Sequence, residues 1–212
     1  MNILKFAVPL ILVASNVRAT EVPVTQDPFG KIASLDVVGC GNGIHARLES
    51  VGTVQSGAVT IKEQALALDF DDFHLSSEDN QQRLACLIDA VVRIPANKLF
   101  CIRRASVHGY AELRNATATL GFDYALQETH DFATAERRAP AGRNTDLEAA
   151  ATIARPGVTP CSHQDQYVHL SGSIWLDLFS NVDDGSGIRL TGQSSSVPAN
   201  AGWVWGWVDC TP

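Results

Sequence analysis

Three tryptophans near the end of the chain alternate with smaller residues, and this spacing could build a binding surface. Trp203, Trp205 and Trp207 are separated by Val204 and Gly206. Residues two apart in a β-strand point to the same side, so the three indoles would share one face. If that face is exposed, it forms a flat ladder about 14 Å long, at ~3.4 Å per residue, able to stack on sugar rings. Because tryptophans are usually well buried, we favour a core location, while the ladder stays the best clue to a ligand.

Two acidic clusters could bind calcium. One is formed by Asp69, Asp71 and Asp72, the other by Asp183 and Asp184. Calcium needs about six or more oxygen ligands, and neither cluster has EF-hand spacing, so solvated carboxylates are the default and no metal is predicted. The second cluster precedes a glycine, which indicates a turn between strands.

Catalytic motifs are absent from the sequence. It contains no GxSxG, phosphate loop, HExxH or dinucleotide fingerprint, and no cofactor is predicted. A hydrolase would need a cleft that gathers carboxylates or histidines, for example Asp69, Asp71 and His108. A Cys101 nucleophile with a histidine base is conceivable, but an exported thiol on a core strand is more often inert.

The first 19 residues resemble a secretion signal. Lys5 precedes the apolar run 6–14, and Val17-Arg18-Ala19 supplies a cleavage site after Ala19. The run is shorter than the roughly 20 apolar residues that span a bilayer, and no later segment is predicted to do so. We expect residues 20–212 to form one exported domain, either extracellular or, in a Gram-negative source, periplasmic.

The charge of the exported chain limits its partners. Residues 1–19 hold two of the 16 basic residues and none of the 23 acidic ones, which leaves a net charge of −9. Nucleic acids and anionic lipids need clustered lysine and arginine, so neither is expected as a partner. A glycan or an extracellular protein is compatible with this charge. The sequon at Asn115 follows a predicted strand and could be N-glycosylated in a eukaryotic source.

Alternation of apolar and polar residues predicts about seven or eight strands. In 84–94 and 117–127 every second residue is apolar, and the alternation slips at Arg103-Arg104, which suggests a bulge. Residues 136–144 are typical of a loop, and 146–154 could form a short helix. Other strands are expected at 59–73, 99–113, 167–179, 187–193 and 203–209. Successive antiparallel strands favour an all-β sandwich, with jelly-roll and immunoglobulin-like topologies both open.

The cysteines predict disulfide stabilisation. In an oxidising compartment four of the five should pair and one thiol is left over, with each bond stabilising the fold by about 2–4 kcal/mol. Spacing does not determine the connectivity; we favour Cys40–Cys86 and Cys161–Cys210. No CxxC or zinc-finger spacing occurs.

A family resemblance rests on the order of several short motifs. They are LALDFDDF at 66–73, RLAC at 83–86, HGYAEL at 108–113, VTPC at 158–161 and WVDC at 207–210. With Gly39-Cys40, this order resembles the secreted domain-of-unknown-function family 4360 of fungi and bacteria, over nearly the whole exported chain. The resemblance implies a small cysteine-stabilised domain without an established activity. It also implies that Cys101 is the odd thiol, because the family pattern has cysteines at the other four positions.

The sequence leaves three hypotheses. The first is a non-enzymatic secreted β-sandwich that binds a glycan, a cell-surface partner or a protein, through the tryptophan ladder or another apolar patch. The second is a secreted hydrolase with an unrecognised site. The third is a structural or matrix protein with buried tryptophans and no pocket.

Overall fold

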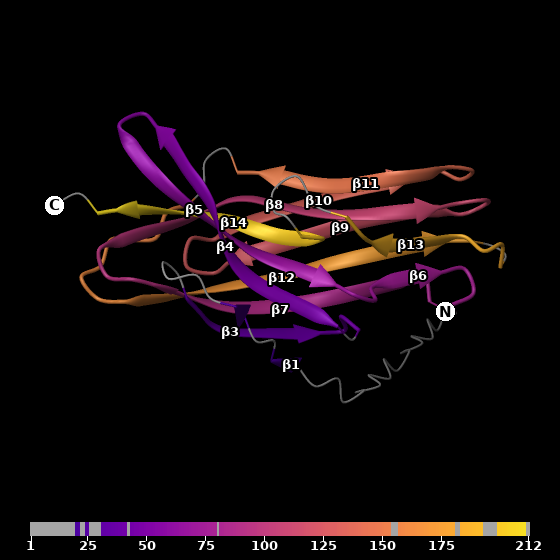
Figure 1. Cartoon of the computed structure of the whole chain (residues 1–212), viewed down its shortest axis with the longest axis horizontal. Coiled ribbons are helices and arrows are strands. Elements are labelled where there is room, and N and C mark those ends of the chain that lie inside the picture. The colour runs from indigo at the N-terminus through magenta and orange to yellow at the C-terminus, as the bar shows by residue number, and fades with distance from the viewer. Residues whose placement is uncertain are drawn as a thin grey trace, which may run out of the picture.

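The chain folds into strands joined by turns (Figure 1). The computed structural model describes residues 20–21, 24–25, 31–41, 43–79, 81–153, 157–180, 183–192 and 199–210, and these contain no helix. The predicted signal peptide at 1–19 lies outside this described part. The strands are β1 (Thr20–Glu21), β2 (Val24–Thr25), β3 (Lys31–Val38), β4 (Ile44–Ser56), β5 (Val59–Phe70), β6 (His74–Ser76), β7 (Arg83–Ile94), β8 (Lys98–Glu112), β9 (Thr117–Leu126), β10 (Asp131–Ala139), β11 (Asn144–Thr152), β12 (Gln166–Phe179), β13 (Gly187–Leu190) and β14 (Ala201–Asp209).

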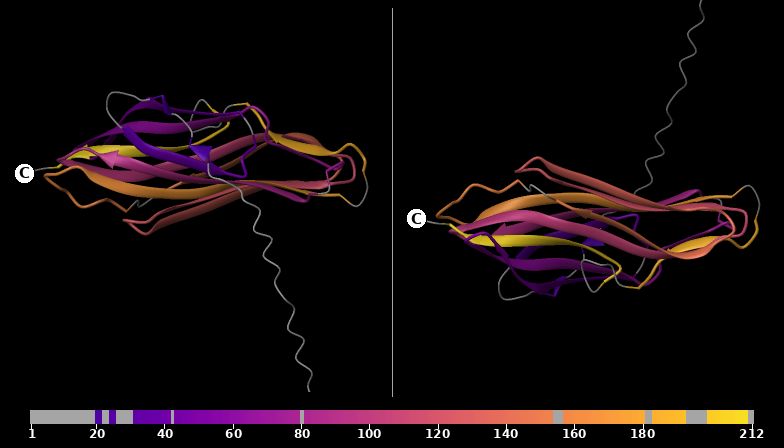
Figure 2. Two further views of the ribbon diagram at one scale, coloured as in Figure 1. Left: turned by 90° about the horizontal axis from the view of Figure 1, so that it is seen from below. Right: turned by 90° about the horizontal axis from the view of Figure 1, so that it is seen from above.

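The strands form two sheets that pack against each other, as both side views in Figure 2 show. Sheet A has the strand order β1-β3-β7-β12-β9-β10. Sheet B has the order β2-β4-β5-β14-β8-β13-β6, and β11 pairs with the remaining side of β8. Among the described strands, only the short β2–β4 pair is parallel. The predicted antiparallel β-sandwich is therefore confirmed.

The predicted alternation in β7 and β9 holds in the structure. Every second side chain of these strands is buried between the sheets, where apolar area is removed from water and stabilises the fold. The residues concerned are Cys86, Ile88, Ala90, Val92 and Ile94 on β7, and Ala118, Leu120, Phe122, Tyr124 and Leu126 on β9.

The predicted bulge also occurs in β8. Val204 of β14 pairs with Arg104 while the next residue pairs with Ile102, so Arg103 is the extra residue. Glu63 on β5 is buried, accepts a hydrogen bond of 2.8 Å from Arg104 and lies 3.7 Å from Arg103. The bulge thus brings two consecutive guanidinium groups to one buried carboxylate, which compensates its charge.

Two disulfides join distant parts of the chain, in the pairs favoured from the sequence. The inner disulfide, Cys40–Cys86, is buried between the sheets. The outer disulfide, Cys161–Cys210, joins the segment before β12 to the end of β14 and is partly exposed. Cys101 is free and buried. Burial raises the pKa of the Cys101 thiol, which disfavours the reactive thiolate.

Two predictions of local structure differ from the structure. The loop predicted at 136–144 is present only as the turn 140–143, because residues 136–139 belong to β10 and pair with β9, and Asn144 begins β11. The segment 146–154 is predicted as a short helix, but residues 146–152 instead lie in β11, which pairs with β8 over its whole length, and residue 154 lies outside the described residues. The alanines at 149–151 favour a helix in isolation, but the edge of β8 supplies backbone partners that override this weak preference.

Candidate binding face

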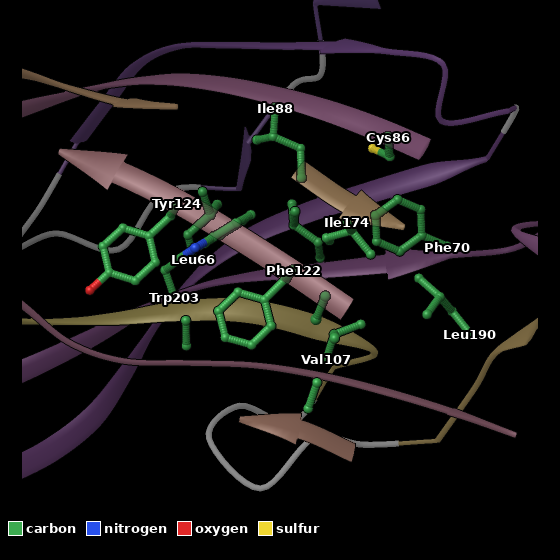
Figure 3. Packing of buried hydrophobic residues seen from close by; sticks show 14 of the residues in the cluster. Leu66, Phe70, Cys86, Ile88, Val107, Phe122, Tyr124, Ile174, Leu190 and Trp203 are labelled. Atoms are coloured by element: carbon green, nitrogen blue, oxygen red, sulfur yellow. The ribbon is translucent and has the colours of Figure 1, made fainter. Parts of the chain in front are cut away.

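The tryptophan ladder lies in the core and not on the surface. The exposed fractions of Trp203, Trp205 and Trp207 are 2%, 0% and 6%. Figure 3 shows Trp203 close to Tyr124 and Phe122 of the facing sheet. A ladder on which sugar rings stack is therefore wrong for these residues, and the favoured core location is confirmed.

The ladder is buried because β14 is a central strand. β5 and β8 flank it, and the indoles point towards sheet A, where Gly172 makes room for Trp203: a Cβ there would lie 3.2 Å from the indole. The indole nitrogens of Trp205 and Trp207 donate to Gln64 Oε1 at 3.4 Å and 2.6 Å. Val204, which points to the other side of sheet B, is buried as well and packs with alanines there.

The remaining tryptophan, Trp175, lies on the outer face of sheet A. It is partly exposed and sits on β12 between Ala85 of β7 and Gly121 of β9. A Cβ at Gly121 would come within 3 Å of three indole atoms, at 2.9 Å from Nε1. The indole therefore lies across β9 directly over Gly121, where any larger residue would lift it from the sheet.

A rigid ion pair borders the Trp175 ring. Arg83 donates from Nε and Nη2 to the two carboxylate oxygens of Asp177, at 2.5 Å and 2.7 Å. The guanidinium carbon lies 5.9 Å from the indole centroid. The hydrogen bonds to Asp177 raise the pKa of Arg83. A bidentate pair holds its side chains in one geometry, so Trp175 has a fixed polar neighbour that can donate to a ligand.

The same face carries further exposed apolar side chains. Leu87 is the next outward-pointing residue after Ala85 on β7, and it is 54% exposed. Its partner on β12 is Ser173, whose backbone amide donates to Asp123 at 2.9 Å. We call this surface the sheet A face. Its large exposed apolar residues are Leu87, Phe132, Tyr167 and Phe179. These exposed apolar residues are spread along the face, with Tyr167 and Phe179 near opposite ends of β12, and Leu87 lies nearest to Trp175.

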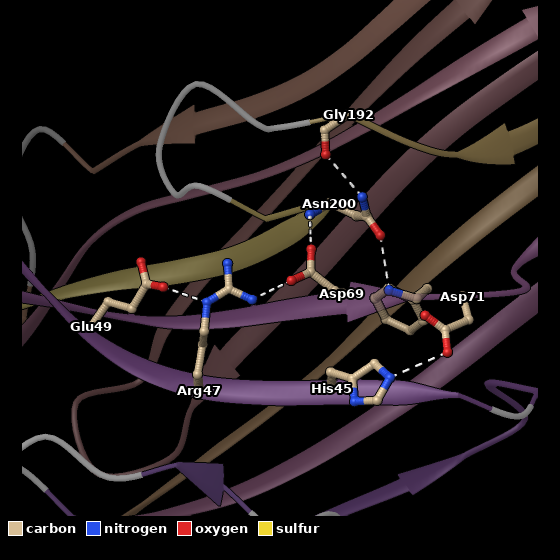
Figure 4. A network of polar contacts seen from close by, with 8 residues as sticks. His45, Arg47, Glu49, Asp69, Asp71, Gly192 and Asn200 are labelled. Carbon is tan, nitrogen blue, oxygen red and sulfur yellow. Dashed lines mark hydrogen bonds and ion pairs between the residues drawn. The ribbon is translucent and has the colours of Figure 1, made fainter.

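The acidic cluster at the end of β5 has a structural role. Figure 4 shows Asp69 between Arg47 and the backbone amide of Asn200, which donates to it at 3.1 Å. Asn200 in turn accepts a hydrogen bond from the backbone of Phe70 at 2.8 Å. Asp71 pairs with His45 at 3.2 Å. These contacts tie Asn200, directly before β14, to β4 and β5. Both carboxylate oxygens of Asp69 already accept hydrogen bonds within the fold.

A shallow hollow of about 370 Å³ lies over β6 and β13 and is the nearest equivalent of the predicted hydrolase cleft. Asp71 lines it, together with an Asp72–His74 pair at 2.6 Å, whereas Asp69 and His108 do not. Its two serines hold turns: the hydroxyl oxygens of Ser76 and Ser186 each accept a hydrogen bond from a backbone amide. The three residues named for a hydrolase are thus not brought together.

The other predicted positions lie away from this hollow or at its rim. His108 Nδ1 forms a hydrogen bond with the backbone carbonyl oxygen of Thr191. Asn115 is exposed in a bend between β8 and β9, and its backbone amide donates to Asp184 at 2.7 Å. The turn predicted at 183–187 is present, with Gly185 at a φ of +71°.

Neither a metal site nor a known relative adds to this picture. Within the described ranges, no group of three or more acidic, histidine or cysteine side chains is placed to hold a metal ion. In the same part of the chain, no helix has the length and apolar character needed to cross a membrane. No family model matches the chain, and no curated protein matches it.

Proposed function

We propose that the protein is an exported, non-enzymatic β-sandwich domain that binds a glycan on the sheet A face, with Trp175 as the stacking residue. One observation carries this proposal. The Trp175 indole lies over Gly121, is partly open to solvent and has a fixed Arg83–Asp177 pair at its border.

A glycan suits this surface because of the chemistry of its parts. A sugar ring has an apolar face of C–H groups, which packs against an aromatic face, and a rim of hydroxyls that need hydrogen-bond partners. The indole and Leu87 supply the apolar contact. Arg83 donates hydrogen bonds, and Asp123 on the neighbouring strand accepts them.

Export is part of the same proposal. The sequence of residues 1–19 resembles a signal peptide, and two disulfides suit an oxidising compartment. The outer disulfide is partly exposed, so the thiol reductants of a cytosol could reach its sulfurs and reduce the bond. We also propose membership of the secreted family 4360, on the order of the motifs at 66–73, 83–86, 108–113, 158–161 and 207–210.

The test is retention of the folded domain on a panel of immobilised polysaccharides, scored by affinity electrophoresis. A Trp175→Ala variant should lose retention that the wild-type protein shows. Phe132→Ala removes a more exposed aromatic from the edge of the same face, at 66% exposure, and should leave retention unchanged. Equal retention of the wild-type and Trp175→Ala proteins contradicts the proposal. The proposal is also contradicted if the wild-type protein is retained on none of the polysaccharides but self-associates through Trp175, since this face would then bind protein.

A further inference from the structure

A second hollow, of about 260 Å³, opens at the end of the sandwich where the β4–β5 hairpin leaves the sheets. We call it the end pocket. Gln64 and Trp207 line it from sheet B, and Pro95 lines it from the turn between β7 and β8. None of the residues that line the end pocket belongs to the proposed glycan site on the sheet A face.

A bulge in β4 explains why the pocket exists. The register of β4 with β5 shifts between Ser50 and Gly52, and Gly52 has a φ of +148°, in the region that favours glycine. Beyond this point the hairpin residues 50–60 are all exposed. Figure 1 shows the hairpin extending away from the other strands at the end of the sandwich where β14 ends. The pocket therefore opens at this end, beside the buried side chains of Gln64 and Trp207.

Gln64, one of the residues that line the pocket, carries a buried donor that is not used. The side chain is 3% exposed, and its Oε1 accepts from both Trp205 and Trp207. Indole N–H groups can only donate, so this arrangement assigns the oxygen and leaves the amide nitrogen on the other side. That Nε2 has no hydrogen-bond partner in the described part of the chain. A buried donor without a partner is costly, and a ligand that accepts from it would remove the cost.

The charges around the pocket favour an anion. Lys62 and Lys98 both line it. The one carboxylate in its lining, Glu63, is already bound by Arg104 at 2.8 Å. Lys98 also pairs with Asp209 at the end of β14. An acceptor-only group, drawn by the ammonium groups, would meet both a positive potential and the Gln64 donor.

We propose that the end pocket binds a small carboxylate, which accepts a hydrogen bond from Gln64 Nε2 while Lys62 and Lys98 balance its charge. Trp207 forms the apolar wall against which the rest of the ligand packs. Two sources carry this chemistry: an acidic sugar and the C-terminus of a peptide.

Titration by NMR tests the proposal directly on the full exported domain. The indole N–H signal of Trp207 and the side-chain amide of Gln64 are followed at constant ionic strength with D-glucuronate, N-acetylglycine, D-glucose and sodium sulfate. Saturable shifts with a carboxylate, but not with glucose or sulfate, are expected. Glucuronate alone identifies an acidic sugar, and N-acetylglycine alone identifies a peptide terminus. No saturable shift with either carboxylate, or an equal response to glucose or sulfate, overturns the proposal.

Two variants locate the site. Gln64→Glu keeps an oxygen for the two indoles but replaces the donor with an acceptor, so affinity should fall about tenfold or more. Lys62→Met, at an exposed position, should also weaken binding and covers the case in which Gln64→Glu does not fold. Lys31→Met removes an exposed lysine from β3 and is the matched control, with affinity unchanged. Wild-type affinity in the folded Gln64→Glu or Lys62→Met protein refutes the assignment.

Discussion

Replacing Gly121 with alanine should separate glycan binding from stability. The new methyl carbon would lie within 3 Å of the Trp175 ring, and since non-bonded carbons prefer about 3.5–4.0 Å, the indole must retreat by roughly 1 Å. The Trp175 side chain sits on the surface and can tilt outwards. The sheet itself should therefore remain intact while the indole loses its support.

The expected change in stability is small because two terms oppose each other. Gly121 has no positive φ, so alanine fits the strand and stabilises the protein by about 0.4–1 kcal/mol through the unfolded chain. Lifting the indole exposes apolar surface on the order of 40 Å², which costs about 1 kcal/mol at ~25 cal/mol per Å². The free energy of unfolding should thus stay within about 1 kcal/mol of the wild-type value. Glycan affinity should fall about tenfold or more, a loss of about 1.4 kcal/mol or more in binding free energy.

Urea unfolding and glycan retention measure the two effects, and Gly109→Ala is the matched control. At Gly109 the methyl group would lie 2.6 Å from the backbone oxygen of Arg189, which cannot tilt away. This variant should lose stability and keep glycan retention wherever it is folded. The reasoning is refuted if Gly121→Ala lowers the free energy of unfolding by several kcal/mol. It is also refuted if the variant leaves both the Trp175 emission and the glycan retention unchanged.

Other parts of the structure lead to further expectations. The two disulfides close loops of similar length, with sequence separations of 46 and 49, so loop entropy assigns each about 4 kcal/mol. Alanine replacement of the inner disulfide should cost about 2 kcal/mol more than that of the outer one in urea unfolding, because it also leaves a cavity; an equal cost would show that burial adds nothing. Cys101 should resist iodoacetamide in the folded protein and react on unfolding, as followed by mass spectrometry; fast labelling of the native protein would contradict its burial. Hydrogen bonds from Arg93 to Asp165, from Ser186 to Asp184 and from Lys98 to Asp209 hold the pKa of each carboxyl below its ordinary value of 3.8. The stability they contribute is therefore present above pH 3.8 and is lost as the pH falls through their lower folded-state pKa values, and Asp165→Asn should flatten the acid end of the stability profile.

Much of the core could be predicted from alternation alone. In β7 and β9 each inward residue is apolar, so the period of two identifies both the strand and its buried face. The bulge at Arg103 could also be predicted, because a single extra residue shifts the alternation that comes after it. In contrast, β10 and β11 are edge strands with mixed composition, and their structure depends on partners that are distant in sequence.

The candidate binding face could not be predicted, because it depends on the register between two strands. Trp175 looks ordinary in an alternating strand, and what makes it distinctive is Gly121, 54 positions earlier, which pairs with it across β9 and β12. The ladder at Trp203 looks more informative in the sequence because its members are close together. The sequence does not show which side of this strand is buried. In the structure β14 lies between β5 and β8, and it carries buried residues on both of its faces.

Iodide quenching of tryptophan fluorescence tests the central claim most directly. Of the four tryptophans, Trp175 is the one that is partly exposed, so a single accessible emitter is expected. Trp175→Phe should abolish the quenchable fraction, and a bound glycan should protect it in the wild-type protein, while Trp203→Phe should leave it in place. Quenching that persists in Trp175→Phe, or that no retained glycan reduces, would contradict a glycan site at Trp175.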